Sequence, residues 1–130
     1  MIEILKKIPF FSELTDEDLQ QIADNIKLEY FPANHVIFEQ GDPGDIMYII
    51  KRGKVQVIRD DSVLAVLEDN AFFGEMALVS DEPRNARIVT VTDLEALTLN
   101  KDDFKRLLET NSSIASIVSY EVVKRANAIF

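Results

Sequence analysis

Short β-type runs, separated by turn signals, fill the middle of the chain between residues 28 and 99. Six runs are rich in β-branched and aromatic residues: His35–Glu39, Ile46–Arg52, Lys54–Arg59, Val63–Leu67, Arg87–Thr92 and Leu94–Leu99. Turn-forming residues stand between them, at Pro32-Ala33-Asn34, Gly41-Asp42-Pro43-Gly44, Gly53, Asp60-Asp61 and Glu68-Asp69-Asn70. Many short strands at close spacing are typical of a sandwich, a jelly roll or a barrel. The pattern therefore predicts a β-sheet core for this zone.

Two of these runs differ in the number of faces that they would bury. Ile46–Ile50 is apolar throughout, which suits a strand covered on both faces. Lys54-Val55-Gln56-Val57 alternates polar and apolar residues, as a strand with one solvent face does. The β zone is therefore expected to contain an interior strand beside half-buried ones.

A helical pattern precedes the β zone. Residues 1–27 read as helical, with one helix expected near 16–26. Thr15 followed by Asp18 resembles a capping box, which marks the start of this helix. Pro9-Phe10-Phe11 is expected to anchor the segment onto the rest of the domain.

Helical patterns also follow the β zone. Asn100 is placed to cap a helix, with Asp103 at its third position. A second helix is expected after Asn111-Ser112-Ser113. Its apolar residues lie on one broad stripe: Ile114, Ile117, Val118, Val122, Ala126 and Ile129. Such a stripe suits a lid, a dimer face or plain packing onto the β core.

Composition excludes several classes of site. The chain has 130 residues, 23 of them acidic and 14 basic, so its formal net charge is −9. That length fits one domain, and the acidic excess disfavours nucleic acid, whose phosphates require clustered Lys and Arg. The chain has no Cys and one His, His35, which excludes disulfides, thiolate metal sites and imidazole clusters. From these counts we expect no metal. The longest apolar run has five residues, against roughly 20 in a spanning helix, so we expect a soluble cytoplasmic protein without a membrane partner.

One segment combines residues suited to a ribose phosphate. Gly74 opens Gly74-Glu75-Met76-Ala77-Leu78, long enough for one or two helical turns, and a helix start offers N–H groups to phosphate. Arg84 follows with a planar cation that matches two phosphate oxygens, and an ionised Glu75 accepts from a sugar hydroxyl. From spacing alone, a structural ion pair between Arg84 and Glu75 is the alternative.

Longer motifs resemble a known family. Phe73-Gly74-Glu75-Met76-Ala77-Leu78 and, four residues on, Pro83-Arg84-Asn85-Ala86 resemble the phosphate-binding cassette of cyclic nucleotide-binding domains. Three further segments resemble the family in order and spacing: Ile8–Phe11 with Leu14-Thr15, Glu39–Asp42 with Gly44, and Met47–Val55. The resemblance implies a mainly β fold, an eight-stranded β jelly roll with an N-terminal helix and C-terminal lid helices. The single domain 1–130 would comprise a lead-in at 1–27, a jelly roll at 28–99 with its cassette near 73–87, and hinge and lid helices at 100–130.

The resemblance also implies roles for individual residues. Glu75 would hold the ribose 2′-hydroxyl and Arg84 the cyclic phosphate. Backbone N–H groups around the ribose phosphate would come from Gly74, Met76, Ala77 and Ala86. Asn85 would add a side-chain donor, and Tyr120 or Val123 of the lid would stack on the purine. Arg87 departs from the pattern, since family members commonly carry Thr or Ser at that position.

The expected function is that of a regulatory sensor, with cAMP ahead of cGMP as ligand. The resemblance implies that binding shifts the C-terminal helices to signal to a partner or an attached domain, and their stripe would serve a partner protein or a homodimer. No enzyme activity and no cofactor are expected, because one His cannot build the metal site of a catalytic jelly roll. Because the sequence stops at Phe130, we expect no DNA-binding helix-turn-helix within it, and the chain either acts alone on a partner protein or is part of a longer regulator, channel or kinase.

The alternative function is a protein-interaction module that keeps the fold and has lost its nucleotide. Arg87 is the feature that favours it, since a side chain that crowds the pocket would exclude the nucleotide. The other two possibilities are that Arg87 supplies a second cation or points outward.

Overall fold

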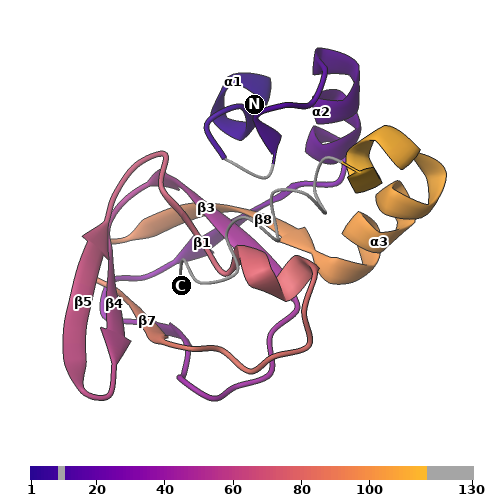
Figure 1. Ribbon diagram of the computed structural model, residues 1–130. Helices are drawn as coiled ribbons and strands as arrows, with labels where there is room; N and C mark the ends of the chain where they lie inside the picture. Colours follow the sequence, from indigo (N-terminus) through magenta and orange to yellow (C-terminus); the bar gives the residue numbers. More distant parts are fainter. Residues whose placement is uncertain (9–10, 117–130) are drawn as a thin grey trace.

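Two four-stranded antiparallel sheets form the centre of the molecule. The computed structural model describes residues 1–8 and 11–116 (Figure 1). The first sheet has the order β1-β8-β3-β6 and the second β2-β7-β4-β5. Their strands are β1 (Lys27–Phe31), β2 (Val36–Phe38), β3 (Ile46–Arg52), β4 (Val55–Arg59), β5 (Ser62–Leu67), β6 (Phe72–Phe73), β7 (Arg87–Thr90) and β8 (Leu94–Asn100). The mainly β class and its eight strands agree with the sequence, while the jelly-roll connection and the lid helices stay predictions.

The central strand β3 is covered on both faces, as its apolar sequence predicts. Met47 and Ile49 point into one cluster of buried side chains, and Tyr48 and Ile50 point into another. These alternate positions separate the two clusters because successive side chains of a strand face opposite sides of the sheet. β3 therefore carries the boundary between a helix-covered core and the core between the sheets.

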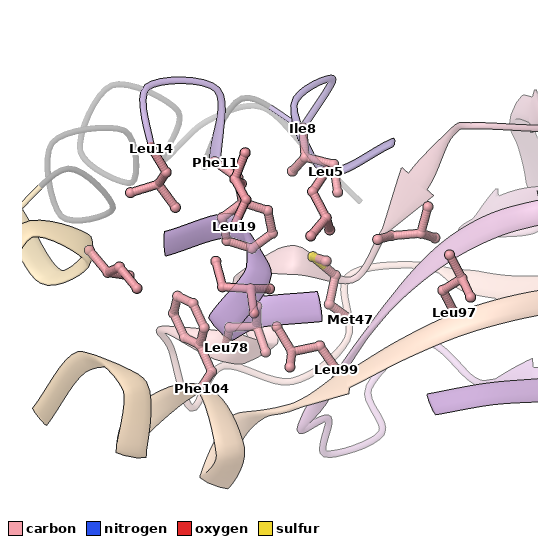
Figure 2. Packing of buried hydrophobic residues seen from close by; sticks show 13 residues of the cluster. Leu5, Ile8, Phe11, Leu14, Leu19, Met47, Leu78, Leu97, Leu99 and Phe104 are labelled. Atoms are coloured by element: carbon pink, nitrogen blue, oxygen red, sulfur yellow. The ribbon is translucent and has the colours of Figure 1, made fainter. Parts of the chain in front are cut away.

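Three helices cover the outer face of the first sheet. They are α1 (Ile2–Leu5), α2 (Asp16–Ala23) and α3 (Lys101–Thr110), and they gather on the side away from the β4–β5 hairpin (Figure 1). Figure 2 shows Phe11 and Leu19 from the N-terminal segment packing in one cluster with Phe104 of α3 and with Met47 and Leu99 of the sheet. Residues 9 and 10 of the predicted anchor lie outside the described residues, but Phe11 is fully buried. The aromatic part of the anchor at Phe11 is thus confirmed.

Side chains begin the two long helices where the sequence places them. The Thr15 hydroxyl accepts from the Asp18 N–H at 3.2 Å, and the Asn100 side chain accepts from the Asp103 N–H at 2.8 Å. Both contacts satisfy N–H groups that a helix start leaves unpaired. The helix predicted at 16–26 is shorter, since α2 ends at Ala23.

A further helix is present as predicted, but it starts at residue 112, two residues earlier than the sequence suggests, and residues 112–116 are helical. The Asn111 Oδ1 accepts from the N–H groups of Ser113 and Ile114, at 3.1 and 3.2 Å. Its Nδ2 donates to Asp18 Oδ1 at 2.7 Å, which ties this start to α2. Ile114 is fully buried, whereas the rest of the apolar stripe, with Tyr120 and Val123, lies outside the described residues.

Replacing Asn111 by alanine is expected to lower the free energy of unfolding by about 1–2 kcal/mol, because it removes a helix cap and a donor to the buried Asp18 carboxylate. Urea denaturation checks this value. Ser113→Ala, at an exposed position of the same turn, is the control and should stay within about 0.5 kcal/mol of the wild type. Equal stabilities for the two variants would contradict the double role of Asn111.

None of the helices in the described part of the chain is long and apolar enough to cross a membrane.

Candidate functional site

The predicted phosphate-binding segment begins at a glycine in a left-handed conformation. Gly74 follows β6 with φ of 75°, a value that favours glycine, and starts the 3₁₀ helix η2 (Glu75–Leu78). The Ala77 N–H donates to the Gly74 carbonyl at 3.1 Å, so this group is engaged within η2. The short helix lies between β3 and α3, where its pink ribbon is seen in Figure 1.

The side chains of η2 are buried or packed against the core. Leu78 is buried in the helix-covered core, and Met76 packs against that core from a partly buried position. Ala77 is also buried. Glu75 is 8% exposed although it is ionisable, and a buried carboxylate requires hydrogen-bond donors or a cation. The structure thus places the predicted ribose acceptor in a water-poor position beside Gly74.

Two backbone hydrogen bonds hold Arg84 against the glycine-rich turn before β3. The Gly41 N–H donates to the Arg84 carbonyl at 2.8 Å, and the Arg84 N–H donates to the Asp42 carbonyl at 2.7 Å. The Arg84 side chain then reaches the start of β3, where Nη2 donates to the Ile46 carbonyl at 2.8 Å. Nη1 lies 3.5 Å from the Gly74 carbonyl, at the long limit of a hydrogen bond. Arg84 thereby joins the turn, β3 and the first residue of the cassette.

Aromatic rings support the guanidinium from below. The Arg84 Cζ lies 4.0 Å from the centre of the Phe38 ring, within the range of a cation–π contact. Phe38 in turn contacts Tyr48 and Phe73, with ring centres 6.1 and 6.0 Å away, and those two rings stack at 5.0 Å. Because Phe73 immediately precedes Gly74, the same aromatic group fixes both the cation and the start of the cassette.

Gly44 leaves the space in which the Arg84 side chain lies. A Cβ at position 44 would stand 2.1 Å from Arg84 Nε and 2.4 Å from its Cζ, far inside van der Waals contact. A Cβ at Gly74 would stand 2.7 Å from Nη1. Two glycines therefore flank the guanidinium, and each allows the close approach of backbone to cation.

The electrostatics favour an anion at this cation. Burial lowers the pKa of Arg84, and the nearby Tyr48, Asp45 and Asp42 oppose that shift. The guanidinium stays protonated, because its pKa remains far above neutrality in proteins. Its Nε is buried and has no hydrogen-bond partner within residues 1–8 and 11–116. A partly dehydrated cation with a donor to spare is suited to binding a phosphate oxygen.

The remaining predicted residues, Asn85, Ala86 and Arg87, directly follow Arg84 in the sequence. The Asn85 carbonyl accepts from Arg59 Nε at 2.8 Å, and the Asn85 residue is exposed. Ala86 is 1% exposed and belongs to the core between the sheets. Arg87 begins β7 and forms an ion pair with Glu39, with 2.9 Å between Nε and Oε1. Arg87 also lines a pocket together with Gln40, Asp60 and Asp61.

The single histidine has a structural contact. His35 is exposed just before β2, and its ring stacks on Phe31 with centres 5.6 Å apart. No group of three or more His, Asp or Glu side chains within the described residues is placed to hold a metal ion.

Sequence reasoning missed three contributors to the site. They are the Ile46 carbonyl, the Phe38 ring and the space at Gly44, and each contacts or makes room for Arg84. All three lie in the segment 38–46, far from Arg84 in the sequence. The sequence shows the turn with Gly41 and Gly44, but it does not show that Gly44 makes room for the Arg84 side chain. Phe38 gives no signal apart from its place in an apolar strand.

Comparisons with known proteins show which family the sequence matches. The family model described as the cyclic nucleotide-binding domain matches residues 28–111. A cAMP-dependent protein kinase regulatory subunit of Pyricularia oryzae is 31% identical over 122 residues, covering 92% of this chain and 31% of that protein. A cGMP-dependent protein kinase, isozyme 1, of Drosophila melanogaster is 34% identical and covers 82% of this chain and 15% of that one. The chain thus spans less than a third of the length of these curated relatives.

Solved structures with similar folds include regulators and a nucleotide complex. The N-terminal domain of a transcriptional regulator from Streptomyces coelicolor has a TM-score of 0.86 at 27% identity, over 95% of this chain and 91% of that one. The regulatory domain of Toxoplasma gondii PKA, crystallised with cAMP, has a TM-score of 0.75 at 25% identity, over 82% and 42%. Since the family model covers more than half of the sequence, the chain belongs to the cyclic nucleotide-binding domain family.

Proposed function

We propose that this chain is a regulatory module that binds a cyclic purine nucleotide, with cAMP ahead of cGMP. The observation that carries the proposal is the Arg84 guanidinium, seated between Gly44 and Gly74 with a buried donor to spare. A relative whose name includes cAMP and a similar structure solved with cAMP support the choice of ligand.

In this proposal Arg84 pairs with the cyclic phosphate. Its Nη atoms are engaged by the Ile46 and Gly74 carbonyls, which aim the guanidinium plane, and Nε is left for a phosphate oxygen. A charge-assisted hydrogen bond in a partly buried place is stronger than one at an exposed surface. Because Nε is buried, its use by a phosphate oxygen requires neighbouring residues to move aside, whereas the carbonyls of Ile46 and Gly74 already fix the plane of the guanidinium.

The ribose lies against Glu75 in the same proposal. Its ionised carboxylate accepts the 2′-hydroxyl, and its 8% exposure limits competition from water. Gly74, Met76 and Ala77 contribute backbone N–H groups from η2, and Ala86 and Asn85 contribute from the strand side. Because the Ala77 N–H donates to Gly74 in this structure, its use by the ligand requires η2 to change shape.

That change supplies the proposed signal. Movement of η2 would be passed to α3 and to the helix that starts at residue 112, whose lid residue over the base would be Tyr120 or Val123. A ligand shifts such an equilibrium only by its difference in affinity for the two states. The domain then acts as a switch within an assembly or a longer protein, and its jelly-roll architecture and C-terminal lid belong to this proposal.

The alternative, an interaction module without nucleotide, rests on Arg87 and receives little support from its place. Arg87 pairs with Glu39 at the rim, so its charge is balanced there. A thermal denaturation series with cAMP, cGMP and AMP at millimolar concentration separates the two functions. A ligand at 100 times its Kd adds about 2.7 kcal/mol of stability, which raises the Tm by roughly 8 °C in a domain of this size. A rise with a cyclic nucleotide and none with AMP supports the sensor, whereas no rise with any of them favours the alternative.

Glu75→Ala is expected to weaken cAMP binding by roughly tenfold, because it removes an acceptor for the ribose hydroxyl. The loss should be much smaller for 2′-deoxy-cAMP, which lacks that hydroxyl. Calorimetric titration of wild type and variant with both ligands measures the four affinities. Equal losses for the two nucleotides would remove Glu75 from this role.

A further inference from the structure

Lys101 makes three contacts that cross between separate parts of the fold. It is the first residue of α3, and its side chain is only 11% exposed. Its Nζ donates to the Ser80 carbonyl at 2.9 Å and to the Asp81 carboxylate. Its backbone N–H donates to the Asp45 carbonyl at 2.7 Å. One residue thus bonds the segment after η2 and the residue before β3 to the start of a helix.

The stability of α3 does not explain a lysine at this position. Cations are unfavourable at a helix N-terminus, where the partial charge is positive, and Asp102 and Asp103 supply the acidic residues that such an end prefers. Lysine side chains are also rarely this buried. The unfavourable free energy of this placement must therefore be offset by other contacts, which are the hydrogen bonds from Lys101 Nζ to Ser80 and Asp81.

Both ends of these contacts belong to the frame of the nucleotide site. The Ser80 N–H donates to the Met76 carbonyl in η2 at 2.9 Å, so Lys101 bonds a residue that lies two positions after the end of η2 and is itself bonded to that helix. Asp45 immediately precedes Ile46, whose carbonyl accepts from Arg84. The hydrogen bond from Lys101 also lowers the pKa of Asp81, so this carboxylate stays ionised in the contact. η2 and α3 are direct neighbours in the structure (Figure 1).

We propose that Lys101 is the positioning residue that couples η2 to α3, so that a change of η2 moves the first turn of α3 with it. The coupling of ligand to helix rests on the proposed function, whereas the Lys101–Asp81 tie itself does not. The tie acts through two charges and a carbonyl rather than through apolar packing, and it can therefore be broken without opening the core.

Hydrogen exchange read by mass spectrometry tests the tie without any ligand. Lys101→Met keeps the apolar stem and removes the ammonium, Asp81→Asn removes the carboxylate charge, and Lys51→Met at an exposed position of β3 is the control. Lys101→Met and Asp81→Asn are each expected to speed exchange over residues 101–104 and 79–82 by about fivefold relative to the control. The variant that carries both substitutions should exchange no faster than Lys101→Met alone. Rates equal to the control in both single variants would overturn the tie.

The same measurement with cAMP tests the coupling. In the wild type we expect the nucleotide to change exchange over both 75–82 and 101–110. In Lys101→Met the change over 75–82 should persist, while the change over 101–110 should fall by about half or more. An undiminished response of α3 in that variant would overturn the coupling. No response of either segment in the wild type would instead remove the proposed function, and the ligand-free comparison would still decide the tie.

Discussion

Arg84→Ala is expected to weaken cAMP binding by about 2–4 kcal/mol, which corresponds to roughly 30- to 1000-fold in Kd. The variant removes a partly buried cation whose donors are already aimed by the Ile46 and Gly74 carbonyls. The phosphate would then enter the same site with its charge unpaired. Isothermal titration calorimetry of wild type and variant measures the loss.

A matched control separates the local role of Arg84 from the net charge of the protein. Arg52→Ala removes the same charge at an exposed end of β3. Its cAMP affinity should stay within about threefold of the wild type, because exposed charges are screened by salt. If Arg84→Ala binds as tightly as Arg52→Ala, the phosphate lies elsewhere.

Gly44→Ala is expected to weaken cAMP binding by roughly 10- to 100-fold although it changes no charge. The added Cβ would lie 2.1 Å from Arg84 Nε, so the side chain must move out of its seat. Overpacking of this kind costs about 1–3 kcal/mol, and here it would displace the guanidinium from the position in which it binds the phosphate. Calorimetric titration measures the affinity, and thermal denaturation shows whether the domain stays folded.

Two comparisons make this result specific. Pro43→Ala changes the same turn without placing an atom against Arg84 and should bind cAMP like the wild type. In an Arg84→Ala background the Gly44 substitution should cause little further loss, because the two changes act on one contact. Additive losses in the double variant would mean that Gly44 acts on binding by another route.

Local sequence patterns predicted the elements whose causes are local. β3 was predicted with its bounds and its two covered faces, because an unbroken apolar run has no solvent face to offer. The starts of α2 and α3 followed from Thr15 and Asn100, whose side chains bond N–H groups three residues on. The turn at Asp60-Asp61 was also predicted, and both residues adopt positive φ.

Elements that depend on distant partners were missed. β1 was not among the predicted strands, although residues 28–31 lie in the predicted β zone, since Lys27 and Glu29 interrupt its apolar pattern and its strand conformation comes from pairing with β8. β6 has two residues and exists through its pairing with β3. In the site, the cassette residues were predicted from a motif. The roles of Phe38, Gly44 and Lys101 were not, because they depend on contacts with residues far away in the sequence.

The central claim is that Arg84 and the cassette form a nucleotide site, and one calorimetric titration tests it most directly. The full chain is titrated with cAMP, and separately with cGMP, at physiological salt. The account predicts saturable binding with one nucleotide per chain for at least one of them, abolished or strongly weakened in Arg84→Ala. The absence of binding of both nucleotides at millimolar concentration by a folded wild-type chain would contradict it.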